Sequence, residues 1–416
     1  MTASPGESVA LTIDKPAAGG RMIARLNGQI VLVGGAIPGE RVIARIERAG
    51  KGVLYADTVS VADASADRRP VTGDPLCGGC LYAHIDYARQ VDIKSQVITD
   101  AFGRIGRLTL PSAVHVAPSP EAGYRMRARL HVRDRRWGFF REGTHDLCDA
   151  RTTQQLLPAT CDTLDRLIAG LASLGLDTVR EIELSENIDA SDRVVCFDVS
   201  SAPVLIDAEM LQRLAQTEGL TGLGPDASVT DRLTIGGAAP VVLKRHALTF
   251  FQGNRYLLSD LVAHVVGLVP SGVDLLDLYA GAGLFAISAA AIRQARVTAV
   301  EGDQIAAADL ISNAAAHEDV AVRHEPVEAF LEAPSRSPAL VIVDPPRTGL
   351  SRAALDGVIR LRAGRVIYVS CDVATLARDS RRLVDAGYDI ERADAFDLFP
   401  NTPHVETVVV FGSRNT

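Results

Sequence analysis

The chain has 416 residues, which is longer than one ordinary folding unit and predicts two or three domains. Apolar residues make up 47% of it and aromatic residues 5%, a composition typical of globular proteins. The net charge of -8 argues against indiscriminate binding to nucleic acid but leaves room for a local basic patch. Because no charge-free apolar run approaches the roughly 18 residues of a membrane helix and no secretory leader is present, we expect a cytoplasmic protein without membrane contact.

Residues 1–66 are predicted to form a small β-barrel. Short apolar runs between residues 7 and 62 are separated by Gly, Pro and Asn-Gly turns. Repeated short strands of this kind are typical of barrels, and a five-stranded OB-like barrel is the natural size. The polar stretch 62–75 contains Pro and Gly breaks and is predicted to be a linker.

The remaining chain is predicted to form two further domains. Residues 67–245 are expected to be a central α+β domain, in which residues 86–105 show helical apolar spacing and are expected to pack on the domain that follows. Residues 246–416 contain near-continuous apolar runs that alternate with helical segments. That pattern predicts a doubly wound α/β domain with a parallel sheet covered on both faces.

A strictly alternating segment marks the central domain. From residue 124 to residue 133 charged and apolar residues alternate, so a strand would place the charged side chains on one face. The charged side chains expected to contact substrate phosphates are Arg125, Arg127 and Arg129. The alternative is the solvated outer face of an antiparallel sheet. Further arginines up to Arg141 favour the phosphate-binding interpretation.

A glycine-containing turn follows the first strand of the α/β domain. Gly281 and Gly283 would let the backbone approach a ligand, and Glu301 ends the next strand, where it could bind ribose hydroxyls. With Ala286 the turn also fits a dinucleotide fingerprint. Asp277, just before the turn, favours S-adenosylmethionine, because the sulfonium and amino groups of that cofactor prefer a carboxylate to a pyrophosphate site.

Three further polar residues end or begin strands of the same predicted sheet. Asp344 precedes two prolines and should face the same crevice as Gly281, although a helix N-cap is the alternative. Cys371 ends the following strand, where a helix beginning near Val373 would favour its thiolate. Glu406 opens the last strand as either an edge residue or a buried base with a raised pKa.

Six motifs occur in an order and spacing that resemble the TRAM-domain family of RNA 5-methyluridine methyltransferases. The motifs are FFQGN (250–254), DLYAGAGLF (277–285), AVEGD (299–303), DPPRTGL (344–350), YVSCDVATLARD (368–379) and FPNTPHVE (399–406). The segment GGAIPGERVIARI (34–46) resembles the TRAM module. The resemblance covers nearly the whole chain and implies a class I methyltransferase domain that uses S-adenosylmethionine.

The resemblance also implies roles for individual residues. Cys371 would be the nucleophile that adds to uracil C6, and Glu406 the base that removes the C5 proton. The cofactor residues would be Gln252, Tyr279, Gly281, Gly283, Glu301 and Asp344, and Arg347 and His404 would join the arginines in binding RNA. The barrel favours ribosomal RNA, most closely the 23S enzymes, with transfer RNA as the alternative target and a monomer as the expected state.

The sequence departs from the family pattern at several positions. Leu284 stands where many members have Asn, and Asp372 replaces the usual Asn after the nucleophile. Members with a [4Fe–4S] cluster have four cysteines, but Val71 and Thr153 occupy two of those places here. The remaining candidate ligands are Cys77, Cys80 and Cys148. We expect a C-x-x-C remnant of reduced thiols without iron, with a rearranged Cys148 ligand left open.

Three other functions compete with this interpretation. An RNA adenine amino-methyltransferase would have an aromatic residue after Asp-Pro-Pro, where Arg347 stands, and would give Cys371 no task. An RNA cytosine-C5 enzyme would carry a second cysteine near that motif. A non-catalytic RNA-binding protein would not need both Cys371 and Glu406.

Overall fold

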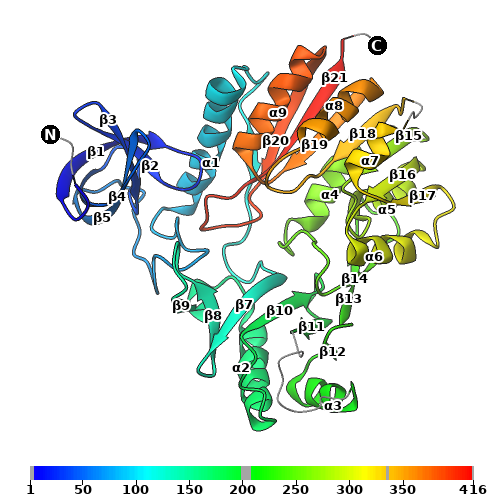
Figure 1. The fold of residues 1–416 in the computed structure, drawn as a ribbon, viewed down its shortest axis with the longest axis horizontal. Helices are drawn as coiled ribbons and strands as arrows, with labels where there is room; N and C mark the ends of the chain where they lie inside the picture. Colours follow the sequence, from blue (N-terminus) through cyan, green and yellow to red (C-terminus); the bar gives the residue numbers. More distant parts are fainter. Residues whose placement is uncertain (1–3, 198–207, 334–336, 415–416) are drawn as a thin grey trace.

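The computed structural model describes residues 4–197, 208–333 and 337–414, which form three units around a common centre (Figure 1). The first unit is a closed barrel with the strand order β1-β2-β3-β5-β4, which confirms the predicted five-stranded barrel. Its strands are β1 Ser8–Pro16, β2 Met22–Leu26, β3 Gln29–Gly34, β4 Arg41–Gly50 and β5 Val53–Asp63. Alternate apolar side chains fill the interior, where Ile13, Val31 and Val33 are at most 1% exposed.

The second unit is a six-stranded sheet with the order β12-β11-β10-β7-β8-β9. Its strands are β7 Arg127–Arg133, β8 Arg136–Phe140, β9 Leu147–Asp149, β10 Glu181–Glu186, β11 Arg193–Cys196 and β12 Gly222–Leu223. The helix α2 (Pro158–Ser173) covers the apolar face of β7, and α3 (Ala208–Glu218) packs beside α2. The charged face of β7 is therefore the face turned away from this core.

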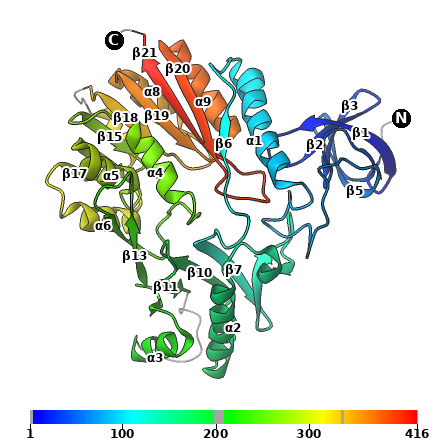
Figure 2. The ribbon, with the colours of Figure 1, turned by 180° about the vertical axis from the view of Figure 1, so that it is seen from behind.

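The third unit is an eight-stranded sheet with the order β17-β16-β15-β18-β19-β21-β20-β6. Its strands are β6 His115–Ala117, β15 Asp274–Leu278, β16 Arg296–Glu301, β17 Val320–His324, β18 Leu340–Val343, β19 Arg365–Ser370, β20 Tyr388–Phe396 and β21 Glu406–Ser413. The strands from β15 to β19 are parallel, and β21 runs antiparallel between β19 and β20. The strand β6 comes from the middle of the chain and extends the edge (Figure 2).

Helices cover both faces of this sheet, which confirms the doubly wound class I fold. One core contains α4 (Leu258–Gly267), α5 (Leu284–Arg293) and α6 (Gln304–Ala314). The other contains α7 (Val327–Glu332), α8 (Arg352–Leu361) and α9 (Val373–Asp385). The order agrees with the rule that parallel strands are buried by helices on both sides. Within the described ranges, none of the helices combines the length and the apolarity needed to cross a membrane.

The helix α1 (Tyr87–Ala101) joins the barrel to the eight-stranded sheet of the third unit (Figure 1). Because this sheet carries the predicted catalytic residues, it is called the catalytic sheet and the third unit the catalytic unit. Ile93 and Val97 pack into the core of the barrel, whereas Ile98 and Phe102 pack against the face of the sheet that carries α9. The helix continues as a π-helical turn over Phe102–Gly106 before the chain enters β6. A single helix therefore contacts two units on opposite flanks, a consequence of its 3.6-residue period.

A hairpin joins the central sheet to the catalytic unit. It consists of β13 (Ser228–Leu233) and β14 (Val241–His246). Leu233, Val241 and Leu243 belong to the same core as α5 and α6, whereas Val229 packs with Val194 of β11. The wholly buried Arg245 pairs with Asp231 within the hairpin at 2.8 Å. The hairpin therefore packs against both the central unit and the catalytic unit.

Candidate active site

The glycine turn lies between β15 and α5 in a tightly bent conformation. Tyr279 has φ 63°, Gly281 has φ 56° and Gly283 has φ 95°, so three residues of one short turn adopt left-handed backbone angles. The backbone N–H of Gly281 donates to Glu301 at 2.8 Å, and the other oxygen of Glu301 accepts from the N–H of Asp303 at 2.7 Å. Glu301 therefore supports the turn, while its contact with a ribose stays a prediction.

Two carboxylates lie under this turn. Asp277 is 1% exposed, and neither of its oxygens has a partner in hydrogen-bond geometry, although the backbone N–H of Ala286 lies close enough to oppose the rise of its pKa. Burial, and then the negative charge of Asp344, raises the pKa of Asp277 well above its usual value. Burial likewise raises the pKa of Asp344 to about 7, although the side-chain amide of Gln252 donates to it at 3.3 Å and opposes the shift. Three residues predicted from separate motifs thus meet beside the glycine turn.

Cys371 lies at the end of β19 and directly before α9, half-buried and near the charges of Asp344, Arg347 and Glu406, and these residues together with the glycine turn are called the crevice below. Burial, and then the charge of Glu406, raises the pKa of its thiol to about 12, while the positive charge of Arg347 acts in the opposite direction. The side chain of Asp372 caps α9 by accepting from the N–H of Thr375 at 2.8 Å. Burial and nearby acids thus raise the pKa of the thiol in the free protein, and the effect of the α9 N-terminus on the thiolate stays a prediction.

Glu406 opens β21 and is only 2% exposed. Since β21 is flanked by β19 and β20, the edge-strand alternative for this residue does not hold. Burial, followed by the charge of Asp344, raises its pKa well above the usual value, and Arg347 again opposes the shift. Its Oε1 atom has no hydrogen-bond partner. A buried carboxyl with a raised pKa has the property that a general base for a weakly acidic C–H needs.

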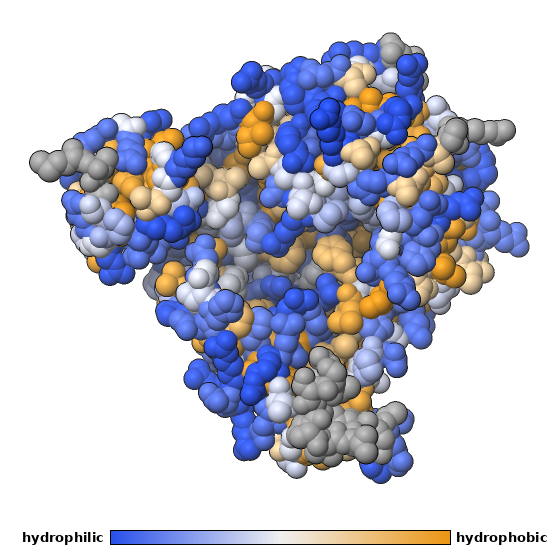
Figure 3. All heavy atoms as spheres, in the orientation of Figure 1, coloured by the Kyte–Doolittle hydropathy of each residue, from blue (hydrophilic) through white to orange (hydrophobic). Residues whose placement is uncertain are grey.

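Arg347 and His404 border the crevice. The charge of Arg347 acts on Cys371, Glu406 and His404, so this exposed guanidinium lies where the three predicted side chains meet. Burial, and then the charge of Arg347, lowers the pKa of His404 to about 4. The imidazole is therefore neutral near neutral pH. On the face seen in Figure 3 the molecule is hollowed near its centre, where the three units meet.

The predicted arginine strand differs from the observed one. The strand β7 begins at Arg127, whereas Arg125 lies before it in an isolated bridge to Asn254 of the FFQGN motif. The guanidinium of Arg125 lies 5.9 Å from the ring centroid of Phe399, so it reaches the catalytic unit. Arg127 donates to the carbonyl oxygen of Leu248 at 3.0 Å.

Acidic side chains neutralise the other end of this face. Arg129 pairs with Glu183 at 2.6 Å and with Glu181 at 3.4 Å, both on the neighbouring strand β10. The charged face of β7 is therefore not cationic throughout, because antiparallel pairing places Glu183 opposite Arg129 and Glu181 opposite His131, whereas Arg127 lies opposite Ser185. The role of Arg129 in binding RNA stays a prediction, and among the three predicted arginines Arg125 is the one that lies near the ring of Phe399, in the loop that carries His404.

The crevice residues fit a cationic ligand. Asp277 and Glu406 both have buried oxygens without partners, and Asp344 is held nearby by Gln252. Unpaired buried carboxylates are costly, and a bound cation would supply the missing interaction. The sulfonium and ammonium groups of S-adenosylmethionine match this need. Gln252, Tyr279, Asp344 and the glycine turn would hold the cofactor there.

The cysteine region does not fit an iron–sulfur cluster. Cys77 and Cys148 form a disulfide, which corrects the expectation of reduced thiols, because the five-residue offset of Cys148 places its Cα 5.8 Å from that of Cys77. Cys80 is buried, and burial raises the pKa of its thiol to about 11. It lines a cavity of about 210 Å³ together with Val71 and Thr153. Nowhere among the described residues are three or more His, Cys, Asp or Glu side chains grouped to hold a metal.

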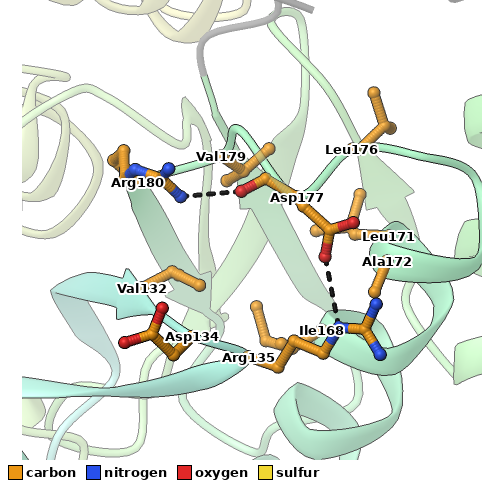
Figure 4. Close-up of a pocket in the computed structure, with 10 residues that line it drawn as sticks. All are labelled: Val132, Asp134, Arg135, Ile168, Leu171, Ala172, Leu176, Asp177, Val179 and Arg180. Carbon is orange, nitrogen blue, oxygen red and sulfur yellow. Dashed lines mark hydrogen bonds and ion pairs between the residues drawn. The ribbon is translucent and has the colours of Figure 1, made fainter.

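A separate cavity of about 380 Å³ lies at the far end of the central unit (Figure 4). It is lined by apolar residues of β7 and α2, and Arg135 at its rim pairs with Asp177 at 3.2 Å. Arg180 donates to the carbonyl oxygen of the same Asp177 at 2.7 Å. None of the predicted site residues lines it, so this cavity is separate from the candidate active site.

Sequence reasoning missed two buried charged residues beside the crevice. Lys94 of α1 is 1% exposed, and Asp397, which follows β20, is fully buried. One signal was present, because Lys94 lies between Ile93 and Val97 on the apolar stripe of a predicted amphipathic helix. A cation in such a stripe indicates a buried partner.

Comparisons with known proteins agree with this architecture. Residues 223–414 match the family described as tRNA (Uracil-5-)-methyltransferase, and residues 3–59 match the TRAM domain. A 23S rRNA (uracil(1939)-C(5))-methyltransferase RlmD of Halomonas elongata is 32% identical over 434 residues, which cover 96% of this chain and 88% of the relative. An uncharacterized RNA methyltransferase of Streptomyces avermitilis is 31% identical over 442 residues, covering 97% and 98% of the two chains.

A solved structure shares the fold. The crystal structure of Pyrococcus abyssi tRNA (uracil-54, C5)-methyltransferase in complex with S-adenosyl-L-homocysteine superposes with a TM-score of 0.73 and 24% identity, covering 96% of this chain and 99% of that one. The sequence relatives extend over the barrel, the central unit and the catalytic sheet alike. The chain belongs to the TRAM-domain family of RNA (uracil-5-)-methyltransferases.

Proposed function

We propose that this enzyme methylates C5 of a uridine in RNA and that its substrate is 23S ribosomal RNA. One observation carries the chemical part of the proposal: the charges of Glu406 and Asp344 both act on the thiol of Cys371. A nucleophile, a base and a cofactor-binding acid therefore share one crevice, and they come from three different motifs. An adenine amino-methyltransferase would need neither the thiol nor the buried base.

The reaction needs two protein groups and one methyl donor. The Sγ atom of Cys371 forms a bond to uracil C6, and the electron pair of the C5–C6 double bond moves toward C5. Bound S-adenosylmethionine would supply an electrophilic methyl group, which C5 accepts, and its sulfur would keep the electron pair of the broken S–CH3 bond and leave as S-adenosylhomocysteine. Glu406 then removes the C5 proton, the C5–C6 double bond re-forms, and the C6–Sγ bond breaks to return the thiolate. Every atom is balanced without an oxidant or a metal.

Protonation in the free protein suggests an order of events. Cys371 has a pKa of about 12, so its thiol holds its proton near neutral pH, and the raised pKa of Glu406 lets its carboxyl hold a proton to a higher pH than a free glutamic acid does. Both must lose it before they act. A cation bound beside Asp344 would favour this loss, because it replaces buried negative charge by a neutral pair.

The RNA is held by the central unit and the crevice border in this proposal. A uracil in folded RNA is stacked, so it must turn out of the stack to reach Cys371. Arg125, which lies over the ring of Phe399, and the neutral His404 are placed to receive the flanking nucleotides. Arg347 would neutralise the phosphate or the developing negative charge on the base.

Ribosomal RNA is preferred on sequence relatedness. Relatives named as 23S enzymes match over 96% and 98% of this chain at 32% and 31% identity. The barrel itself does not discriminate, because an enzyme described as acting on tRNA shares the fold over 96% of the chain. Transfer RNA therefore stays the second candidate. A cytoplasmic location and a monomeric state complete the proposal.

The test uses labelled S-adenosylmethionine with purified ribosomal and transfer RNA, each prepared without its natural methyl groups. The expected product is 5-methyluridine in 23S RNA at a single position. Methylation of transfer RNA alone would replace the ribosomal target, and a methyl group found on adenine would overturn the proposed reaction. Cys371→Ser serves as the matched inactive control.

A further inference from the structure

One loop leads directly to Glu406, the proposed base. The loop of residues 397–405 connects β20 to β21, and the residues at its two ends, Phe396 and Glu406, face each other in the strand register. His404 lies in it, and Glu406 follows it directly. Whatever holds this loop therefore sets where the carboxyl of Glu406 points.

A buried ion pair holds the beginning of the loop. The Nζ atom of Lys94 lies 2.5 Å from Asp397, and the two side chains are 1% and 0% exposed. The same Nζ donates to the carbonyl oxygen of Phe399 at 3.1 Å, and the hydroxyl of Tyr87 donates to the other oxygen of Asp397 at 3.1 Å. A fully buried lysine is rare, and burying its charge costs free energy, so this ion pair is weak evidence for a purely stabilising role.

A second contact from the same helix holds the tip of the loop. Gln90 donates to the side-chain oxygen of Asn401 at 2.9 Å and accepts from its backbone N–H at 2.9 Å. Asn401 has φ 63°, a left-handed conformation that this pair of hydrogen bonds stabilises. Gln90 and Lys94 are four residues apart and share one face of α1, so the helix binds the loop at two points, Asn401 and Asp397.

The barrel contacts the same loop from the other side. A Cβ atom on Gly20 would come within 2.8 Å of Pro403, which precedes His404. Gly20 also has φ 92°, which side chains rarely adopt. The loop is therefore confined between α1 and the first turn of the barrel.

We propose that Lys94 and Asp397 are positioning residues for proton removal by Glu406. This inference rests on the proposed function and deepens it. The pair touches neither the thiol nor the glycine turn, so addition of Cys371 and methyl transfer should survive its loss. The later step should fail, because a displaced Glu406 cannot reach the C5 proton and the methylated base stays bound to sulfur.

The experiment measures how much enzyme remains covalently attached to unmodified uridine RNA during turnover. Lys94→Met removes the cation, and the double variant Lys94→Met with Asp397→Leu removes both charges and so avoids an unpaired buried carboxylate. Single-turnover methyl transfer is expected to stay within about threefold of wild type, whereas release of RNA slows by about 10- to 100-fold. Covalent enzyme–RNA complex should accumulate in both variants. Asp397→Asn, which still accepts from Lys94, should accumulate little.

Two controls separate this inference from the proposed function. Glu406→Gln should accumulate the same complex, and failure of that variant to do so would count against the proposed chemistry rather than the positioning role. Arg68→Met removes the partner of the buried Glu40, 2.6 Å away, and should lower stability without any accumulation. A folded double variant that releases RNA as fast as wild type, or that loses methyl transfer and release equally, would overturn the inference.

Discussion

The side-chain amide of Gln252 donates to the carboxylate of Asp344 at 3.3 Å, although the two residues are 92 positions apart in the chain. The contact joins the FFQGN motif to the DPPRTGL motif across the crevice. It brings a segment that precedes the catalytic sheet to Asp344, which is proposed to bind the cofactor. It also leaves Asp344 as the buried acid that a cationic ligand would meet.

Replacing Asp344 by Asn should weaken binding of the cofactor. Loss of an interaction with a charged group costs about 1.5–3 kcal/mol, which corresponds to an increase in Kd of about 10- to 100-fold. Calorimetric titration with S-adenosylhomocysteine and S-adenosylmethionine would measure it, and the loss should be larger for the cationic ligand. Asp319→Asn, at an exposed position outside the crevice, is the control. If D344N bound each ligand with the same Kd as wild type does, Asp344 would not be part of the cofactor site.

The same substitution should stabilise the free protein. Because burial raises the pKa of Asp344 from 3.8 to about 7, the folded state binds a proton that the unfolded state releases. The contribution of this group to stability is complete below about pH 4 and falls as the pH rises to about 7. Asp344→Asn should therefore gain up to about 4 kcal/mol at neutral pH. Urea denaturation of wild type and Asp344→Asn at acidic and at neutral pH tests this. A difference in unfolding free energy between the two proteins that is the same at both pH values would contradict it.

Methyl transfer should accelerate as the pH rises through and above neutrality. Cys371 must be a thiolate, and burial raises its pKa to about 12, so the reactive fraction grows about tenfold per pH unit. Single-turnover rates at saturating RNA and cofactor give the profile. A rate that is flat or falls across that range would show that another group limits the reaction.

Arg125 should contribute more to RNA binding than Arg129. The guanidinium of Arg125 has no carboxylate partner among the described ion pairs and faces the crevice, whereas Arg129 is already paired with Glu183 and Glu181. Arg125→Ala should weaken binding and lower the salt dependence by about one ion, while Arg129→Ala should change little. Filter binding at several salt concentrations compares the two. Equal effects would argue for a continuous phosphate-binding face on β7.

The Cys77–Cys148 disulfide should stabilise the central unit without metal. It closes a long loop, so Cys148→Ser should cost about 2–4 kcal/mol under non-reducing conditions and nothing once wild type is reduced. Denaturation with and without a dithiol reductant measures this difference. Iron found in stoichiometric amounts after anaerobic purification would contradict it and restore a cluster.

The sequence predicted the barrel and the doubly wound sheet because each depends on local patterns. Strand endings such as Asp344 and Cys371 come close together once β18 and β19 are recognised as parallel neighbours. The protonation of Cys371 could not be predicted in this way, since it depends on burial and on Glu406, which is distant in sequence. The ion pair of Arg129 with Glu183 could not be predicted for the same reason, because it depends on the pairing of β7 with β10, which are distant in sequence.

Longer-range contacts were also beyond the sequence. The pairing of Lys94 with Asp397 joins residues 303 positions apart, and no periodicity reports such a pair. Similarly, β6 joins the edge of the catalytic sheet from within the middle of the chain. Both features depend on how the three units pack against one another, and local sequence patterns carry no information about that packing.

The covalent bond between Cys371 and a pyrimidine tests the account most directly. RNA that carries 5-fluorouridine at the target position keeps fluorine where the base would remove a proton, so the complex cannot resolve. Protease and nuclease digestion followed by mass spectrometry should locate one methylated fluorouridine adduct on the peptide that contains Cys371, and none in Cys371→Ala. An adduct on Cys80 or another residue, or methyl transfer that persists in the alanine variant, would contradict it.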